Sequence, residues 1–309
     1  MRIVISEFMD AAAVQSLRRR FEVDYAPELV DDRPSLLARL AAAHALIVRN
    51  GTRVDADVLG HAPLLRSVGR LGVGLDNIDV AACEARGIAV FPATGANALA
   101  VAEYVIFSAM MLLRGAWQAT PAVAAGAWPR AALSGGRETF GKTLGLVGFG
   151  GIGQLTAVRA RALGMRVVAS DPALPADLPL WHEQGVEPLP LERLLGEADV
   201  VSLHVPLSPA TRGLMNAARV AAMKSGAVLI NTSRGGIVDE AALARALEEG
   251  RLAGAALDVF EHEPLPAASP LAGAPNLLLT PHIAGVTAES NERVSTMIAD
   301  VVGRFLSAG

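Results

Sequence analysis

The sequence predicts an α/β protein made of two doubly wound domains, each built on a parallel sheet. Short apolar runs that are typical of strands alternate with longer helical stretches along nearly the whole chain. The length of 309 residues suits about two domains with sizeable cores. Hydrophobic residues make up 52% of the chain and charged residues 19%, which indicates a folded globular protein.

The first part of the chain contains four apolar runs and several helical stretches. Helices are predicted at residues 11–20 and 34–43, and strands near 2–6, 44–48, 65–69 and 87–91. The stretch 97–113 is apolar nearly all round, which predicts a long buried helix, in part against a second subunit. The stretch 117–137 after it is interpreted as irregular.

From residue 143 the alternation of strands and helices resumes. Strands are predicted near 143–148, 166–170, 199–203, 226–231, 253–257 and 276–280. The last stretch, 287–306, has the pattern of an amphipathic helix. Strands separated by helices lie parallel and are joined by right-handed crossovers, which predicts the doubly wound arrangement.

A glycine-rich turn follows the first strand of this second part. The turn residues are Gly148, Gly150, Gly151, Ile152 and Gly153, and the next predicted strand ends on Asp171. An acid about 20 residues after such a turn completes the fingerprint of a Rossmann-type dinucleotide-binding unit. In this unit Gly148 permits the turn, Gly150 admits a pyrophosphate, and Gly153 lets the helix pack close to the strand. The helix N-terminus offers N–H groups to the phosphates.

The acid at the end of the second strand predicts the choice of cofactor. Asp171 would accept hydrogen bonds from ribose hydroxyls and repel a 2′-phosphate. The next four residues, 172–175, contain no Arg or Lys that could neutralise such a phosphate. The sequence therefore favours NAD over NADP.

A second nucleotide motif competes with this interpretation. Residues 136–143 satisfy the G-x-x-x-x-G-K-[ST] pattern of a P-loop. A P-loop requires a strand before the pattern and a helix after its Lys-Thr. Here the preceding stretch is short and turn-rich, and an apolar strand follows. We interpret these residues as an entry loop.

Charge and cysteine content restrict the partners and the compartment. The formal net charge is −4, which predicts no general attraction to nucleic acid or to an anionic membrane. A single cysteine, Cys83, suits a reducing cytoplasm. The chain opens on a strand-like run instead of a signal peptide, and no apolar span reaches the ~20 residues that a membrane helix needs. We expect a cytoplasmic protein.

Polar residues directly follow three of the predicted strands, at 231–236, 258–264 and 280–284. Ligands of doubly wound sheets bind outside the carboxyl ends of the strands. These segments supply a guanidinium, carboxylates and an imidazole at one rim of the sheet. Hydride transfer from a secondary alcohol needs such a set: a cation for the substrate carboxylate, a base for the hydroxyl proton, and a carboxylate that orients the base.

Several motifs in order resemble the D-2-hydroxyacid dehydrogenase family over essentially the whole chain. The matching stretches are Gly72–Asp79, Asn97 with Val101–Glu103, Gly141–Gly145, His204–Leu207, Asn231–Gly235, Ala256–Phe260 and Pro281–Ala284. The resemblance implies an oxidoreductase that transfers a hydride between NAD(H) and a small D-2-hydroxy acid or its 2-oxo acid.

The resemblance also implies roles for individual residues. Arg234 would hold the substrate carboxylate and carbonyl oxygen, His282 would be the acid/base, and Glu263 would pair with His282. The backbone around Val73 and Gly74 would receive the substrate carboxylate. Further substrate contact is implied for Asn97, and further cofactor contacts are implied for His204, Pro206, Thr211, Thr232, Asp258 and His282.

Two arginines near strand ends bear on the substrate. At Leu46–Arg49, Val68–Arg70 and Trp128–Arg130 the chain is most similar, within the family, to D-3-phosphoglycerate dehydrogenases. Residues 5–10 also resemble relatives that oxidise sulfolactate. A substrate with a second anionic group needs its own cation, which predicts Arg49 and Arg70 as ligands. Phosphate and sulfonate are both tetrahedral anions, so the arginines do not separate them.

Other interpretations remain open at this level. Arg49 and Arg70 could be solvated strand-end charges, and the enzyme could then act on untailed acids, as glyoxylate and hydroxypyruvate reductases do. A member of the same fold could also sense NAD(H) as a corepressor-like binding protein without turnover. A metal site is not predicted, because the adjacent residues Glu261, His262 and Glu263 would not converge on one ion.

The predicted architecture is a discontinuous one. Residues 1–95 and 285–309 form a flavodoxin-like substrate domain, and 96–284 form the Rossmann-type NAD-binding domain. A homodimer is expected, with 97–113 and 117–137 at its interface.

Overall fold

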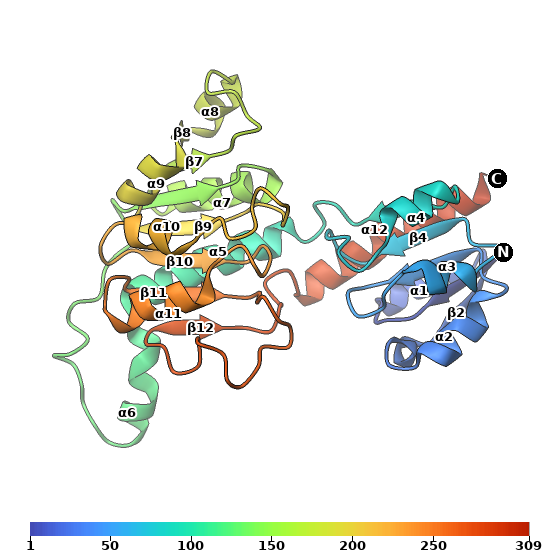
Figure 1. Ribbon diagram of the computed structural model, residues 1–309, viewed down its shortest axis with the longest axis horizontal. Helices are drawn as coiled ribbons and strands as arrows, with labels where there is room; N and C mark the ends of the chain where they lie inside the picture. Colours follow the sequence, from blue (N-terminus) through green and yellow to red (C-terminus); the bar gives the residue numbers. More distant parts are fainter. Residues whose placement is uncertain (309) are drawn as a thin grey trace. The chain divides into compact units, whose positions relative to one another are not determined.

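The computed structural model describes residues 1–308, which divide into two compact units. The first unit comprises Met1–Asn97 and residues from 286 onward, and the second comprises Ala98–Gly285. Each unit contains one sheet, of five strands in the first and seven in the second, and the strand pairs are parallel (Figure 1). The predicted fold class is confirmed.

The sheet of the first unit has the strand order β2-β1-β3-β4-β5, the flavodoxin-like order. Its strands are β1 (Arg2–Ile5), β2 (Glu22–Tyr25), β3 (Ala45–Val48), β4 (Ser67–Arg70) and β5 (Ala89–Pro92). Its helices are α1 (Ala11–Arg18), α2 (Arg33–Leu40), α3 (Ala56–Gly60), α4 (Val80–Ala85) and α12 (Ala288–Ser307), with a 3₁₀ turn η1 (Pro27–Val30). Apolar side chains of α1 and α12 cover one face of the sheet, and those of α2, α3 and α4 cover the other.

The sheet of the second unit has the order β12-β11-β10-β9-β6-β7-β8, which is the Rossmann order with a seventh strand. Its strands are β6 (Thr143–Val147), β7 (Arg166–Ser170), β8 (Glu187–Pro188), β9 (Val200–Leu203), β10 (Val228–Asn231), β11 (Gly254–Leu257) and β12 (Leu277–Leu279). Its helices are α5 (Ala98–Arg114), η2 (Ala116–Ala119), α6 (Thr120–Ala124), α7 (Gly151–Ala162), α8 (Pro179–Gln184), α9 (Leu191–Glu197), α10 (Ala217–Ala222) and α11 (Glu240–Glu248). Because Thr143 begins a strand, residues 136–143 are an entry loop and not a P-loop.

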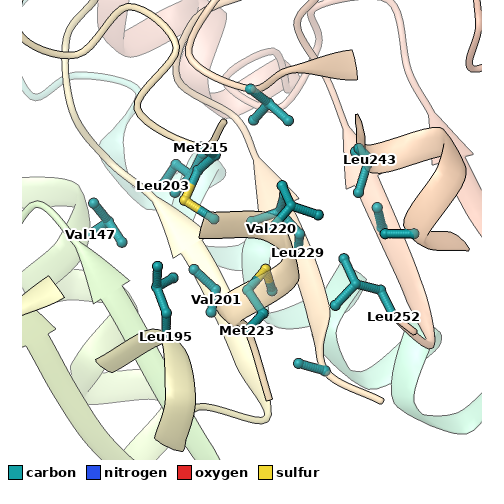
Figure 2. Packing of buried hydrophobic residues seen from close by; sticks show 14 of the residues in the cluster. Val147, Leu195, Val201, Leu203, Met215, Val220, Met223, Leu229, Leu243 and Leu252 are labelled. Atoms are coloured by element: carbon teal, nitrogen blue, oxygen red, sulfur yellow. The ribbon is translucent and has the colours of Figure 1, made fainter. Parts of the chain in front are cut away.

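Two apolar layers hold the second sheet in place. Figure 2 shows one of them, where Val201 and Leu229 of the sheet meet Leu195 of α9, Val220 of α10 and Leu243 of α11. The other layer joins α5 and α7 to the opposite face of β6 and β10. Central strands are therefore buried on both faces, which explains why they are continuous apolar runs in the sequence.

The structure departs from the sequence-based expectation at two edge strands and at residues 116–124. Strands β2 and β8 were not predicted, because both lie at sheet edges and carry polar residues. Residues 117–137 were predicted to be irregular, but η2 and α6 cover residues 116–124. On α5, Phe107 is 56% and Met110 45% exposed in the single chain, and the burial of this face against a second subunit stays a prediction. Over residues 1–308, no single helix has the length and composition to cross a bilayer; α5 and Ala116–Ala124 would meet both criteria only as a pair bent by 60°.

The helix starts differ in a way that matters for the site. Many helices begin with a side-chain cap, such as Asp10 before α1 and Asp239 before α11, whose carboxylates accept backbone N–H bonds. Helix α7 begins after Gly150 without a side-chain cap. Its first N–H groups and the positive end of its dipole are therefore available to an anion.

Candidate active site

The glycine turn lies where the strand order of the second sheet reverses, between β6 and β9. Gly148 has a φ of +96°, and a Cβ there would stand 2.5 Å from the carbonyl oxygen of His204. A Cβ on Gly153 would stand 2.7 Å from the carbonyl oxygen of Gly148. Only glycine fits either position, so these residues set how closely β6, β9 and α7 approach one another.

The open side of this turn suits a pyrophosphate. A Cβ on Gly150 or Gly151 would meet no atom within 4 Å, apart from those of adjacent residues and of the backbone of the same helix. Ile152 follows them in the first turn of α7. This unfilled space beside an uncapped helix start matches the cradle that phosphate oxygens need. The residues present therefore fit a dinucleotide.

Asp171 closes the turn from the end of β7. Its Oδ2 accepts from the N–H of Phe149 at 2.8 Å, and its Oδ1 accepts from the N–H of Ala173 at 3.0 Å. Each oxygen of a carboxylate has about two acceptor positions, so capacity remains for a ribose hydroxyl. Asp171 thus supports the glycine turn in addition to facing the expected ribose site.

The neighbouring loops add neutral polar groups. Burial lowers the pKa of His204 to about 4, so its imidazole is uncharged at neutral pH, with Nε2 3.0 Å from the hydroxyl of Ser202. Thr211 ties its loop together by donating to the carbonyl of Pro206 at 2.5 Å. The hydroxyl of Thr232 is buried, and within residues 1–308 it has no hydrogen-bond partner. Such a hydroxyl is a natural contact for a ligand.

The structure brings Glu263 and His282 together. Nδ1 of His282 lies 2.8 Å from Oε2 of Glu263, and Oε1 of Glu263 accepts from the N–H of Phe260 at 3.0 Å. A carboxylate only accepts, so Nδ1 carries the proton and Nε2 is left to exchange one with a substrate. This is the arrangement of a general acid/base and its orienting acid.

Asp258 holds the turn that carries His282. The carboxylate is 1% exposed and accepts from the hydroxyl of Thr280 at 2.7 Å and from the N–H groups of Ile283 and Ala284, both at 2.8 Å. Its backbone carbonyl accepts from the N–H of His282 at 2.9 Å. Of about four acceptor positions, one remains for an amide such as that of nicotinamide.

Arg234 lies just beyond the end of β10, in a loop packed on the Glu263 loop. Its Nη1 donates to the carbonyl of Ser233 at 2.6 Å, and its own carbonyl accepts from the side-chain amide of Asn231 at 3.0 Å. A Cβ on the next residue, Gly235, would stand 1.7 Å from the carbonyl oxygen of Phe260. Glycine is therefore required for this approach, which brings the guanidinium-bearing loop against the loop of the acid/base pair.

In the first unit, Arg49 and Arg70 lie at the carboxyl ends of adjacent strands. Arg70 is paired in register with Val48, and Arg49 follows Val48. The sheet order reverses between β1 and β3, so this edge is also the expected ligand crevice of that unit. The guanidinium of Arg49 donates to the amide oxygen of Asn291 at 2.7 Å. Burial lowers the pKa of Arg49, an effect that the nearby Glu7 charge opposes.

Glu7 fixes the loop that carries Arg49. Its carboxylate accepts from the N–H groups of Arg49, Gly51 and Thr52, at 2.7, 3.0 and 2.9 Å. Asn77 holds the same loop by donating to the carbonyls of Arg49 and Thr52. No role for Glu7 is predicted from the sequence, where it is only one of residues 5–10. Its signal is an acid directly after the first strand, the same type of position that marks the rim segments.

The remaining residues predicted to contact the substrate lie in the loop after β4 and at Asn97, where the first segment of this unit ends. Gly72 makes room for Arg70, because a Cβ there would stand 1.7 Å from Nη1 of Arg70. Val73 is 38% exposed and Gly74 follows it. The side-chain oxygen of Asn97 is buried and, in the described part of the chain, accepts no hydrogen bond.

Comparisons with known proteins identify the family of the chain. The family model described as D-isomer specific 2-hydroxyacid dehydrogenase, NAD binding domain, matches residues 106–284. The chain belongs to the D-isomer specific 2-hydroxyacid dehydrogenase family. It is an NAD-dependent oxidoreductase, and its substrate is a small anionic hydroxy acid.

Three relatives show how this dehydrogenase compares within the family. It is 58% identical to an (S)-sulfolactate dehydrogenase of Chromohalobacter salexigens, over 98% of both chains. It is 38% identical to a hydroxypyruvate reductase of Thermotoga maritima, over 99% of this chain and 98% of the relative. It is also 38% identical to a D-3-phosphoglycerate dehydrogenase of Methanocaldococcus jannaschii, but spans only 57% of that protein.

Solved structures share the fold of this dehydrogenase over its length. The TT0316 protein of Thermus thermophilus superimposes with a TM-score of 0.91 at 38% identity, covering 100% of this chain and 97% of that one. A D-lactate dehydrogenase of Aquifex aeolicus, solved with NAD and lactic acid, gives a TM-score of 0.87 at 29% identity, covering 100% and 96%.

Proposed function

We propose that this dehydrogenase transfers a hydride between NAD and a D-2-hydroxy acid that carries a second anionic group, with a sulfolactate-type acid as the substrate. The observation that carries this proposal is the preset Arg49 loop, held through three N–H bonds by Glu7 at the ligand edge of the first sheet. The relative at 58% identity, named for sulfolactate, supports a sulfonate as the tail.

The chain's own residues divide the work of the reaction. Arg234 binds the carboxylate and polarises the adjacent oxygen. His282 takes the hydroxyl proton at Nε2 while Glu263 stabilises the resulting imidazolium. When bound, NAD supplies the hydride acceptor. The turn Gly148–Gly153, Asp171, the hydroxyl of Thr232 and the open position on Asp258 are the groups that hold it.

Arg49 and Arg70 bind the tail in this proposal, while Val73, Gly74 and Asn97 contact the carboxylate end. Accordingly, residues 1–95 and 285–309 act as the substrate domain and 96–284 as the NAD domain. The single cysteine continues to favour a cytoplasmic location, which stays a prediction.

We also propose a homodimer that covers the outward face of α5. Phe107 and Met110 are 56% and 45% exposed on α5, and Trp128 is 81% exposed in the loop beyond α6. This loop and α6 project away from the sheet of their unit (Figure 1). Exposed large apolar side chains on a projecting segment are typical of an association surface.

The tail proposal is tested by comparing tailed and untailed acids. Wild-type enzyme should prefer sulfolactate to lactate in kcat/KM. Arg49→Ala should lower kcat/KM for sulfolactate by about ten- to a hundredfold, because a charge-assisted contact is worth roughly 1.5–3 kcal/mol. Lactate should be almost unaffected.

Arg86→Ala serves as the matched control, because Arg86 is an exposed arginine of the same unit at the end of α4. It should leave both substrates unchanged. Equal losses on both acids for Arg49→Ala would show that Arg49 is structural. A wild-type preference for hydroxypyruvate or lactate would favour the untailed alternative.

A further inference from the structure

Helix α5 reaches the turn of His282 through one tyrosine. The hydroxyl of Tyr104 lies 2.5 Å from the hydroxyl of Thr280, which is 176 positions away in the chain. Thr280 directly follows β12 and stands two residues before His282. Tyr104 lies between Val101 and Val105, whose side chains are buried on the same helix.

The direction of the hydrogen bonds along this chain of groups is determined by the acid at its end. The hydroxyl of Thr280 donates to Oδ1 of Asp258 at 2.7 Å. A carboxylate only accepts, and the threonine hydroxyl has one proton, so Tyr104 must donate to Thr280. Burial and the charge of Asp258 raise the pKa of Tyr104, which keeps this donor protonated. Hydrogen bonds in such a row polarise and strengthen one another.

Asp258 connects these hydrogen bonds to the turn that carries the acid/base His282. Its two oxygens accept from the N–H groups of Ile283 and Ala284, and its carbonyl accepts from that of His282. His282 has a φ of +56°, a left-handed conformation that is unfavourable for a residue with a side chain. Such a conformation persists where the surroundings enforce it. The N–H groups of His282, Ile283 and Ala284, all bonded to Asp258, lie in the turn that adopts this conformation.

We propose that Tyr104 and Thr280 are positioning residues that hold His282, through Asp258, in register with Glu263 and the substrate hydroxyl. The proposal rests on the proposed role of His282 as the acid/base. Neither Tyr104 nor Thr280 needs to touch substrate or cofactor. Their contribution is the orientation of the Asp258 carboxylate, and therefore of the turn that carries the imidazole.

The test uses four variants of the full-length enzyme and a matched control. Tyr104→Phe keeps the ring and removes only the donor, and Thr280→Val removes the relaying hydroxyl, while Thr280→Ser keeps it. The double variant Tyr104→Phe/Thr280→Val is the fourth. Tyr25→Phe is the control, since the Tyr25 hydroxyl also bonds another residue, the carbonyl of Met9 at 3.3 Å, in the first unit. Thermal melts confirm that each variant is folded.

We expect kcat with sulfolactate to fall about tenfold for Tyr104→Phe and for Thr280→Val, less than the 10²–10⁴-fold that general acid–base catalysis contributes. The dissociation constant of NADH should rise by a smaller factor than kcat falls, because Asp258 is only one of the groups proposed to hold NAD and keeps its N–H bonds from Ile283 and Ala284. The midpoint of the rise of kcat/KM with pH should move to lower pH, because the Glu263 carboxylate stabilises a displaced His282 imidazolium less. Thr280→Ser should restore most of the rate, and the double variant should be no slower than Thr280→Val.

His282→Ala distinguishes a failure of the proposed acid/base role of His282 from a failure of the positioning role of Tyr104 and Thr280. If His282→Ala retains most of the turnover, the proposed role of His282 fails, and the positioning role fails with it. If His282→Ala is inactive while Tyr104→Phe keeps both the wild-type kcat and the wild-type pH profile, only the positioning role is overturned. A rate loss in Tyr104→Phe without a shift in the pH profile, or an equal loss in Tyr25→Phe, would also overturn it.

Discussion

Asp171 supports the glycine turn, in addition to the contact with the cofactor ribose that we propose for it. The spacing from the glycine turn predicts an acid that faces the ribose, and the structure adds that Oδ2 accepts from the N–H of Phe149 inside the turn. Replacing the whole carboxylate would therefore disturb both the turn and the charge. An amide removes the charge but keeps only one acceptor oxygen, so one of the two N–H bonds, from Phe149 or Ala173, can persist.

Asp171→Asn should narrow the preference for NADH over NADPH by about tenfold, because the like-charge repulsion of a 2′-phosphate disappears. Fluorescence titration with both nucleotides measures this change. Asp177→Asn is the control, since Asp177 is an exposed acid in the same loop region. An unchanged ratio in Asp171→Asn, or wild-type enzyme that binds NADPH as tightly as NADH, would remove Asp171 from cofactor choice.

For single residues, the sequence predicts which side chains have the chemistry of a site better than it predicts their hydrogen-bond partners. Motif positions place Arg234, Glu263 and His282 in loops that the structure packs together, because all follow parallel strands of one sheet. The roles of Glu7 and Tyr104 depend on partners 42 to 176 positions away. No local pattern encodes such partners, so they become visible only in the folded chain.

His204, which directly follows strand β9 beside the glycine turn, makes the free energy of unfolding depend on pH. Burial lowers the pKa of His204 at its end to about 4, whereas an unfolded histidine titrates near 6.5. Between these values the unfolded chain binds a proton that the folded chain excludes. The free energy of unfolding should therefore fall as the pH decreases from about 6.5 to about 4, by at most about 3 kcal/mol from this group.

Urea denaturation at pH 7.5 and pH 5 compares wild type with His204→Gln, which cannot titrate. The variant should lose less stability on acidification than wild type. Identical losses would show that His204 is not excluded from protonation in the folded state. His61→Gln is the control, because the His61 side chain is 53% exposed.

At the level of elements, the sequence predicts the central strands and the edge strands β5 and β12, and it misses the edge strands β2 and β8. Strands β6, β9 and β10 are continuous apolar runs because both faces are covered. Edge strand β2 carries Glu22 and Asp24, and β8 has only two residues. Neither has the length or the pattern that distinguishes a strand from a loop.

At the scale of the whole molecule, the exposed face of α5 predicts association. Light scattering at micromolar concentration should give about twice the 32.0 kDa mass of one chain. The double variant Phe107→Asp/Met110→Asp should shift the mass to that of one chain, because charges would be buried unpaired. Leu64→Asp, at a 50% exposed leucine of the first unit, is the control and should stay dimeric. A wild-type mass near 32.0 kDa would rule out the dimer.

We propose that this chain oxidises a 2-hydroxy acid with an anionic tail and passes the hydride to NAD. The most direct measurement is kcat/KM of the wild-type enzyme with NAD for sulfolactate, 3-phosphoglycerate and lactate in parallel. We expect kcat/KM for sulfolactate to exceed kcat/KM for lactate by about tenfold or more, since the tail adds charge-assisted contacts. Lactate equal to or better than both tailed acids would contradict it.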